Sequence, residues 1–434
     1  METKPTATVL AIALLTGPAL AGGVPTGSGA ESLWLPFDEV RSPDPVEEGG
    51  FGETVAYADG ILLVGAPAER TVYVFEERPS GWTHATTLSV DEVTVRDRFG
   101  ASLAFDGTTA AVGAPGASTV YAFERDLDRW SEPVTLDDGS VSFTGFGWSL
   151  ALEGDRLVIG APHASVDGVD KAGSIHVYDT TQGGWSEEHT ISTPARSSGL
   201  LGWSVDTSGA KLAAGAMGSA SVEIYQQASG SWSHVQSLTS EAAWDGNGRE
   251  VALQGQTLAV GAPFASSEGG FDSGAAYLYD ERGSGWTQAT VLWPQDVNPL
   301  ETNAGFGTSL AITGDEGQLL VGAPEDDPSP GDSGATPAGQ DPVCVSLAIS
   351  PTCQRPGAAY LFSSDEGVWE QTQKLTAPDA SPAALRQVSA PGGFGSSVAI
   401  DGETLAVGAP LADGVPGDES GSSWIFQHIG GVGS

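Results

Sequence analysis

A pattern that recurs seven times along the chain constrains its fold more than any other feature. Each copy starts with Phe-Gly or a variant, continues through two short apolar runs and ends in Gly-Ala-Pro or a variant, as in Gly393–Pro410. A repeat of about 40–50 residues indicates one supersecondary unit per copy, whose neighbours bury one another's faces. The glycines that open the closing triplets are Gly65, Gly113, Gly160, Gly215, Gly261, Gly322 and Gly408.

Each copy carries the patterns of four β-strands and no helical period. In the seventh copy, Ser397–Ile400 and Thr404–Val407 are joined by Asp-Gly, a dipeptide typical of tight hairpins. In the first copy, Thr71–Phe75 is a third run rich in β-forming residues, and a fourth run begins at Trp82. Four antiparallel strands repeated seven times predict an all-β fold, a seven-bladed β-propeller.

The two ends of the chain together supply the last blade. The seventh copy has no Trp-led fourth strand after Phe426, whereas Ser32–Phe37, before the first Phe-Gly, resembles that strand. We therefore predict that an N-terminal strand completes blade seven and removes the open edge of its sheet. The alternative is that Trp34 belongs to a linker.

Residues 1–21 have the pattern of a secretory signal peptide. Lys4 precedes the apolar stretch Thr8–Leu20, which is short for a membrane span, and Ala19-Leu20-Ala21 fits a cleavage site. We expect a secreted or cell-surface protein cleaved near Ala21. A linker at 22–31, a single propeller domain at 32–428 and a tail at 429–434 would follow, without membrane insertion.

The longest insertion, residues 325–357 in the sixth copy, is rich in Pro, Gly, Ser and Asp, as surface loops are. It contains both cysteines of the chain, Cys344 and Cys353. Two cysteines in an exported protein predict a disulfide. A metal site is the weaker interpretation, because no histidine lies nearby to complete the ligand set.

The chain carries 56 acidic and 17 basic residues, a net charge of −39. This charge repels nucleic acids and anionic membrane surfaces, so neither is expected as a partner. Solubility in a saline medium accounts for the charge more directly than cation binding does, and both interpretations stay open.

The repeat resembles the FG-GAP repeat of integrin α-subunit headpieces and of many exported prokaryotic proteins, over residues 32–428. The motifs are Phe-Gly, Gly-Ala-Pro, a third strand with Tyr or Phe and a Trp-led fourth strand. Phe-Gly becomes Leu201-Gly202 in copy four and Asn247-Gly248 in copy five, and Gly-Ala-Pro becomes Gly-Ala-Met217 in copy four. The resemblance implies a seven-bladed propeller that binds partners on one face.

One departure from integrin-type repeats concerns calcium. Several of their first hairpins carry an Asp-x-Asp-x-Asp-Gly loop that binds calcium through converging oxygens. The turns of this chain, such as Asp59-Gly60 and Asp401-Gly402, have too few carboxylates. The chain is therefore similar to the short bacterial and archaeal variant, and no calcium is expected in these turns.

The loops that follow Gly-Ala-Pro all emerge on one face of a propeller, and those of copies five, six and seven are long and acidic. They predict one acidic sector across adjacent blades, with weak calcium binding in the millimolar range and no other cofactor. Composition alone is the other explanation. The candidate ligands are Asp272, Glu325, Asp326, Asp327, Asp332, Asp413, Asp418 and Glu419.

No catalytic constellation stands out in the sequence. The six histidines lack metal-ligand spacing, and no nucleophile elbow or phosphate loop is present. Paired acids for glycoside hydrolysis are not a specific signal among 56 carboxylates. Six tryptophans recur once per copy, which predicts packing between blades: Trp82, Trp130, Trp185, Trp232, Trp286 and Trp369.

The sequence thus favours a monomeric, non-catalytic binding or adhesion propeller whose partner is an extracellular protein or glycan. Two alternatives remain: a secreted propeller hydrolase or lyase acting on polysaccharide, and a structural surface protein without a specific ligand.

Overall fold

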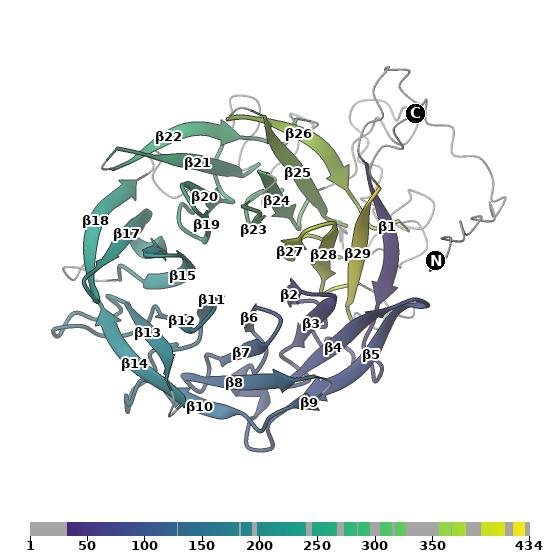
Figure 1. The fold of residues 1–434 in the computed structure, drawn as a ribbon, viewed down its shortest axis with the longest axis horizontal. Helices are drawn as coiled ribbons and strands as arrows, with labels where there is room; N and C mark the ends of the chain where they lie inside the picture. Colours follow the sequence, from purple (N-terminus) through teal and green to yellow (C-terminus); the bar gives the residue numbers. More distant parts are fainter. Residues whose placement is uncertain are drawn as a thin grey trace, which may run out of the picture.

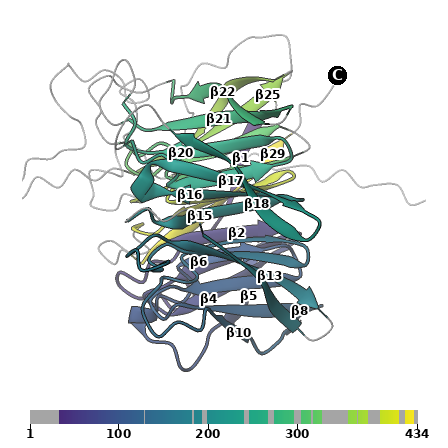
Figure 2. The same ribbon diagram turned by 90° about the vertical axis from the view of Figure 1, so that its left-hand side faces the viewer.

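The computed structural model describes residues 33–127, 129–181, 184–192, 198–239, 245–266, 273–283, 285–295, 304–314, 317–326, 356–365, 367–378, 392–412 and 420–429. In these residues seven antiparallel sheets surround a common axis (Figure 1), and the ring is shorter along this axis than across it (Figure 2). The described part has no α-helix, only two 3-10 turns, Val95–Asp97 and Met217–Ser219. The predicted seven-bladed propeller is confirmed.

The strands of each blade follow one another from the central axis outwards. Blade one has β2 (Thr54–Ala58), β3 (Ile61–Ala66), β4 (Thr71–Arg78) and β5 (Gly81–Leu88). Blade two has β6 (Ser102–Phe105), β7 (Thr109–Ala114), β8 (Thr119–Asp126) and an outer strand split into β9 (Arg129–Trp130) and β10 (Val134–Asp137). Blade three has β11 (Ser149–Glu153), β12 (Arg156–Ala161), β13 (Ser174–Thr181) and β14 (Gly184–Ile191). Blade four has β15 (Leu201–Ser208), β16 (Lys211–Ala216), β17 (Ser221–Ala228) and β18 (Ser231–Thr239).

The remaining blades keep the same order. Blade five has β19 (Glu250–Gln254), β20 (Thr257–Ala262), β21 (Ala275–Arg282) and β22 (Gly285–Leu292). Blade six has β23 (Ser309–Ile312), β24 (Gln318–Ala323), β25 (Ala358–Asp365) and β26 (Val368–Leu375). Blade seven has β27 (Ser397–Asp401), β28 (Thr404–Ala409) and β29 (Ser422–Ile429), and its outer strand is β1 (Leu33–Val40).

The N-terminal strand closes the ring as the sequence predicts. β1 pairs antiparallel with β29, from Leu33 opposite Ile429 onwards (Figure 1). Trp34 is only 2% exposed and packs in a cluster of residues from blades six and seven. Its backbone also bonds the amide of Gln373 in blade six, at 3.0 Å through its N–H and at 2.7 Å through its carbonyl. The first strand is therefore part of the core and not a linker.

Neighbouring blades meet where two glycines touch. A Cβ atom on Gly65, the Gly-Ala-Pro glycine of blade one, would lie 2.3 Å from the carbonyl oxygen of Gly100, the Phe-Gly glycine of blade two. The last seam repeats this contact, because a Cβ on Gly408 would lie 2.1 Å from the oxygen of Gly52. The same approach occurs at all seven seams, so only glycine fits there. This contact is the physical reason for the spacing of the repeat.

A hydroxyl group completes six of the seven seams. A Ser or Thr on the innermost strand of one blade donates a hydrogen bond of 2.7 to 3.1 Å to the Phe-Gly glycine carbonyl of the next blade. These residues are Thr54, Ser102, Ser149, Ser204, Ser309 and Ser397. Buried carbonyls need such partners, so the hydroxyls satisfy the groups that the close glycine contacts bring out of water.

The once-per-repeat tryptophans pack in the core, as predicted. Trp82 and Trp286 are buried, and the other four are partly buried against clusters that join neighbouring blades. The predicted signal peptide, linker and disulfide between Cys344 and Cys353 lie outside the described residues. None of the helical segments in the described part of the chain could span a membrane.

The seam between blades five and six has a carboxyl group in place of the hydroxyl. Glu250 occupies this position on β19, and burial together with the charge of Asp206 on β15 raises its pKa to about 8. Burial likewise raises the pKa of Asp206 to about 7, although the backbone N–H groups of Leu253 and Thr207 donate to its carboxylate. Blades four and five thus share two acids whose pKa values are raised well above their ordinary range.

Shortening Trp34 tests the closure of the ring. We expect Trp34→Ala to lower the free energy of unfolding by about 3–5 kcal/mol, because it leaves a cavity between blades six and seven. The exposed Phe37 on the same strand provides the control, and Phe37→Ala should change the stability by about 0.5 kcal/mol or less. Urea unfolding measures both. Equal effects of the two variants would contradict closure by β1.

Replacing Glu250 tests the paired acids. Because its folded-state pKa lies above the ordinary 4.5, its contribution to stability is full below pH 4 and is lost as the pH rises through about 8. Glu250→Gln cannot ionise, so we expect wild-type stability near pH 4 and a gain of about 1–3 kcal/mol at pH 9, after allowance for solvent screening. Urea unfolding at both pH values measures the gain. The control is Glu188→Gln on the exposed side of β14, and a gain that does not depend on pH would refute the assignment.

Candidate functional site

Two of the eight predicted cation ligands, Glu325 and Asp326, lie in the described part of the chain. Asp326 is 2% exposed; its Oδ2 accepts a hydrogen bond of 2.6 Å from the Tyr360 hydroxyl and lies 2.8 Å from Lys374 Nζ. This carboxylate therefore ties a loop of blade six to its two outer strands. The other six lie outside the described residues: Asp272, Asp327, Asp332, Asp413, Asp418 and Glu419.

The described residues contain no group of three or more His, Cys, Asp or Glu side chains that could hold a metal ion. Weak calcium binding by the acidic loops stays a prediction. Asp326 has a structural role in these loops, because its carboxylate already has the Lys374 ammonium and the Tyr360 hydroxyl as partners. Blades three and four instead bring together aromatic and polar side chains that suit a binding site.

An aromatic cluster joins blades three and four, formed by Phe143, Trp148, His163 and Trp203. The indole rings of Trp148 and Trp203 lie 4.7 Å apart between centroids, and the His163 ring is 5.2 Å from Trp148. Phe143 extends the cluster outwards, with its ring 5.2 Å from His163 and 55% of its surface exposed. The two tryptophans are half-buried, so the cluster presents a partly accessible apolar surface.

The repeat itself positions this cluster. Trp148 and Trp203 directly follow the Phe-Gly-type glycines of their blades, at the entrance to the innermost strands. The corresponding residues of the other five blades are Glu53, Ala101, Arg249, Thr308 and Ser396. Trp148 and Trp203 come from adjacent blades at the same height in the ring, so their rings meet across the seam.

His163 follows the Gly-Ala-Pro triplet of blade three, and its backbone N–H donates to the carbonyl of Thr144 at 2.9 Å. Burial, and to a lesser extent the charge of Lys171, lower the pKa of its imidazole. Its Nδ1 atom is buried without a hydrogen-bond partner in the described structure. The ring therefore favours its neutral form and acts as part of the aromatic surface.

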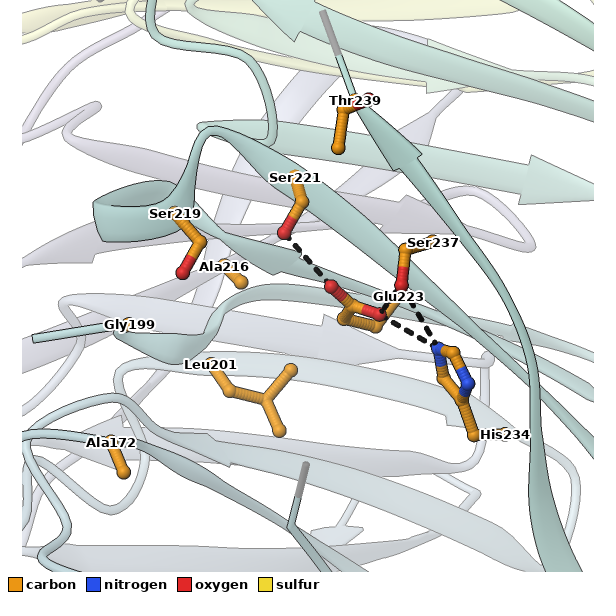
Figure 3. A pocket seen from close by; sticks show the side chains of 10 residues that line it. All are labelled: Ala172, Gly199, Leu201, Ala216, Ser219, Ser221, Glu223, His234, Ser237 and Thr239. Atoms are coloured by element: carbon orange, nitrogen blue, oxygen red, sulfur yellow. Dashed lines mark hydrogen bonds and ion pairs between the residues drawn. The ribbon is translucent and has the colours of Figure 1, made fainter. Parts of the chain in front are cut away.

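A cavity of about 220 Å³ lies between the loop of blade three and the outer half of blade four (Figure 3). The same loop carries His163 of the cluster: Ala172 lines the cavity, and the N–H of the next residue, Gly173, donates at 3.0 Å to the carbonyl of Ala164, which follows His163. Small residues form one side, and Leu201 lies only two positions before Trp203 of the aromatic cluster. The polar side has Glu223 with hydroxyl groups and an imidazole around it. The lining residues are Ala172, Gly199, Leu201, Ala216, Ser219, Ser221, Glu223, His234, Ser237 and Thr239.

Glu223 is the centre of the polar side. Its carboxylate accepts a hydrogen bond of 2.8 Å from Ser221 at Oε1 and one of 2.5 Å from Ser237 at Oε2 (Figure 3). His234 Nε2 lies 2.7 Å from the same Oε2, and the His234 ring packs edge-on against Tyr225 at 5.4 Å. Burial, followed by the charge of Glu223, raises the pKa of the Tyr225 hydroxyl. The contacts with Ser221, Ser237 and His234 hold the Glu223 carboxylate in one orientation, and only 8% of the residue is exposed.

The side chains Ser237, His234 and Glu223 do not form a proton relay. A relay needs the nucleophile and the acid on different nitrogens of the imidazole. In blade four Ser237 Oγ, at 3.3 Å, and Glu223 Oε2 both contact Nε2, and Ser237 also donates directly to Glu223. The geometry of these three residues suits the binding of a polar group.

Sequence reasoning missed Trp148, Trp203, Glu223 and His234 as site residues. The signal that could have found them is a comparison of the seven copies position by position. Two tryptophans stand where other copies have polar or small residues, and copy four has Leu201 in place of Phe and Glu223 in place of the common Tyr.

Comparison with known proteins supports the repeat and the fold. The FG-GAP repeat family matches residues 134–178, 232–279 and 369–426. Each matched segment runs from the outer strand of one blade to the third strand of the next, so the sequence repeat is offset from the blade by one strand.

A comparison with curated protein sequences gave no match. Among solved structures, a chain in "Structure of U3-55K" aligns with a TM-score of 0.54 at 11% sequence identity, over 89% of this chain and 97% of that chain. A likeness at this identity concerns the fold alone. Together with the seven sheets, these matches show that the chain is a seven-bladed β-propeller that contains FG-GAP repeats.

Proposed function

We propose that the protein is an exported, non-catalytic binding propeller that recognises a glycan through the loops of blades three and four. The aromatic cluster is the observation that carries this proposal. Pyranose rings have apolar C–H faces that pack on aromatic rings, and hydroxyl groups around their edge that need hydrogen-bond partners. The cluster supplies aromatic rings for the apolar faces, and the cavity of blade four supplies hydrogen-bond partners for the hydroxyl groups.

The shape of the cluster supports a ligand that binds at the surface. Phe143 is mostly exposed and Val141, two residues earlier, is fully exposed, although both are apolar. Exposed apolar side chains beside half-buried tryptophans are typical of binding surfaces, where aromatic residues contribute large contact areas. The export part of the proposal is supported by the signal-peptide pattern of residues 1–21.

A glycan array followed by calorimetry on the mature protein, beginning at residue 22, tests this function. We expect binding to at least one class of oligosaccharide. Trp203→Ala should weaken it about tenfold or more, equivalent to a loss of about 1.4 kcal/mol in binding free energy. The loss follows because the variant removes one of the two indoles that contact each other and leaves Trp148 without this neighbour.

The matched control is Leu411→Ala. Leu411 follows the Gly-Ala-Pro triplet of blade seven, as His163 does in blade three, and it is 56% exposed. This variant should bind like the wild type. An array without signal would exclude glycan recognition, and equal losses in the two variants would show that the aromatic cluster is not the site.

A further inference from the structure

We propose that the cavity of blade four holds the primary ammonium group of an amino sugar. This inference rests on the glycan recognition proposed above and names the sugar class. Three observations carry it: the origin of the cavity, the charge of its lining, and the strand and loop that it shares with the aromatic cluster.

Two changes of residue create the cavity. In blade one, Phe51 of the Phe-Gly pair packs against Tyr73 of the third strand, with ring centroids 5.5 Å apart. Blade six repeats this pair with Phe306 and Tyr360 at 5.4 Å. In blade four Leu201 and Glu223 occupy the two positions, so both rings are missing and about 220 Å³ is left open. The cavity therefore results from the two residues that stand at these positions in blade four.

The lining is negatively charged. None of the ten residues around the cavity is Lys or Arg, and His234 carries a charge only when it is protonated. Glu223 Oε1 accepts one hydrogen bond from a side chain, that of Ser221, and a carboxylate oxygen has a second lone pair to offer. In a half-enclosed cavity the attraction between this carboxylate and a cation exceeds that in bulk water.

Hydroxyl groups of the lining can accept hydrogen bonds from further polar groups of the same sugar. An ammonium has three N–H donors, and Ser219 and Thr239 line the cavity together with Glu223. The cavity is smaller than the roughly 300–1,000 Å³ of pockets that hold drug-sized ligands, so it fits the amino-bearing edge of one sugar. Leu201 of the cavity and Trp203 of the cluster lie on the same strand, β15, so the next sugar of a chain would extend towards the aromatic cluster.

Calorimetry with two matched oligosaccharides tests the inference. The probes are a β-1,4-linked hexamer of glucosamine and the same hexamer fully N-acetylated, which has no ammonium group. We expect the wild type to bind the amine form at least tenfold more tightly. Glu223→Gln keeps the size of the side chain and removes its charge, so it should reduce the preference to about twofold or less.

The control for long-range charge is Glu187→Gln in blade three. Blade three also has an imidazole–carboxylate pair, but the two residues have exchanged strands relative to Glu223 and His234. His176 lies on the third strand and Glu187 on the fourth, and their side chains are 2.8 Å apart. The His176 ring packs on Phe146 at 5.1 Å and so occupies the place that is open in blade four. This variant removes the same charge from the protein and should keep the full preference.

A second variant, Leu201→Phe, restores the residue that five copies of the repeat carry and fills the cavity with its ring. It should fold with wild-type thermal stability and lose the preference for the amine form. A preference that survives in both Glu223→Gln and Leu201→Phe, or tighter binding of the N-acetylated hexamer by the wild type, would overturn the inference and leave glycan recognition intact. If no glycan binds, both proposals are wrong.

Discussion

The close approach of two glycines at each seam is the constraint on which the ring depends. The second strand of one blade and the Phe-Gly turn of the next come so near that a single Cβ atom would overlap a carbonyl oxygen. That contact removes a backbone carbonyl from water, and a Ser or Thr hydroxyl then satisfies it at six of the seven seams. The glycines, the hydroxyls and the buried phenylalanines therefore form one unit. Few residue types are therefore possible at the seam, whereas the residues around it can vary much more.

This division explains why the fold can be predicted from the sequence. The seam requires the same residue types at the same spacing in every copy, so the period is visible in a single chain. The closing strand is predictable for a related reason: the repeat is offset from the blade by one strand, and Trp34 occupies the place of the missing outer-strand tryptophan. Burial of Trp34 between blades six and seven confirms that prediction in physical terms.

The candidate site could not be predicted in the same way, because it depends on contacts between copies. Trp148 and Trp203 each look like an isolated departure in their own copy, and they form one surface only when adjacent blades meet. For Asp326 the sequence predicts a site residue where the structure shows a structural one. Its neighbours in the sequence suggest an exposed acidic loop, whereas Lys374 and Tyr360, which come later in the chain, bury it in an ion pair and a hydrogen bond. Local composition does not determine which of many carboxylates acquires a partner.

Blades three and four show how a repeat can vary a site without disturbing the seam. Both have an imidazole–carboxylate pair between their third and fourth strands, His176 with Glu187 and Glu223 with His234. The pair is equally well formed in either order, because the two strands face each other. The order nevertheless decides what remains beside the Phe-Gly position. A ring on the third strand fills the space against Phe146, whereas a carboxylate there, combined with Leu201, leaves it open and negatively charged. Exchanging the histidine and the glutamate between the two strands thus keeps the pair intact but changes the surface beside it. In this way a ring of repeated blades can gain a binding site without a change of fold.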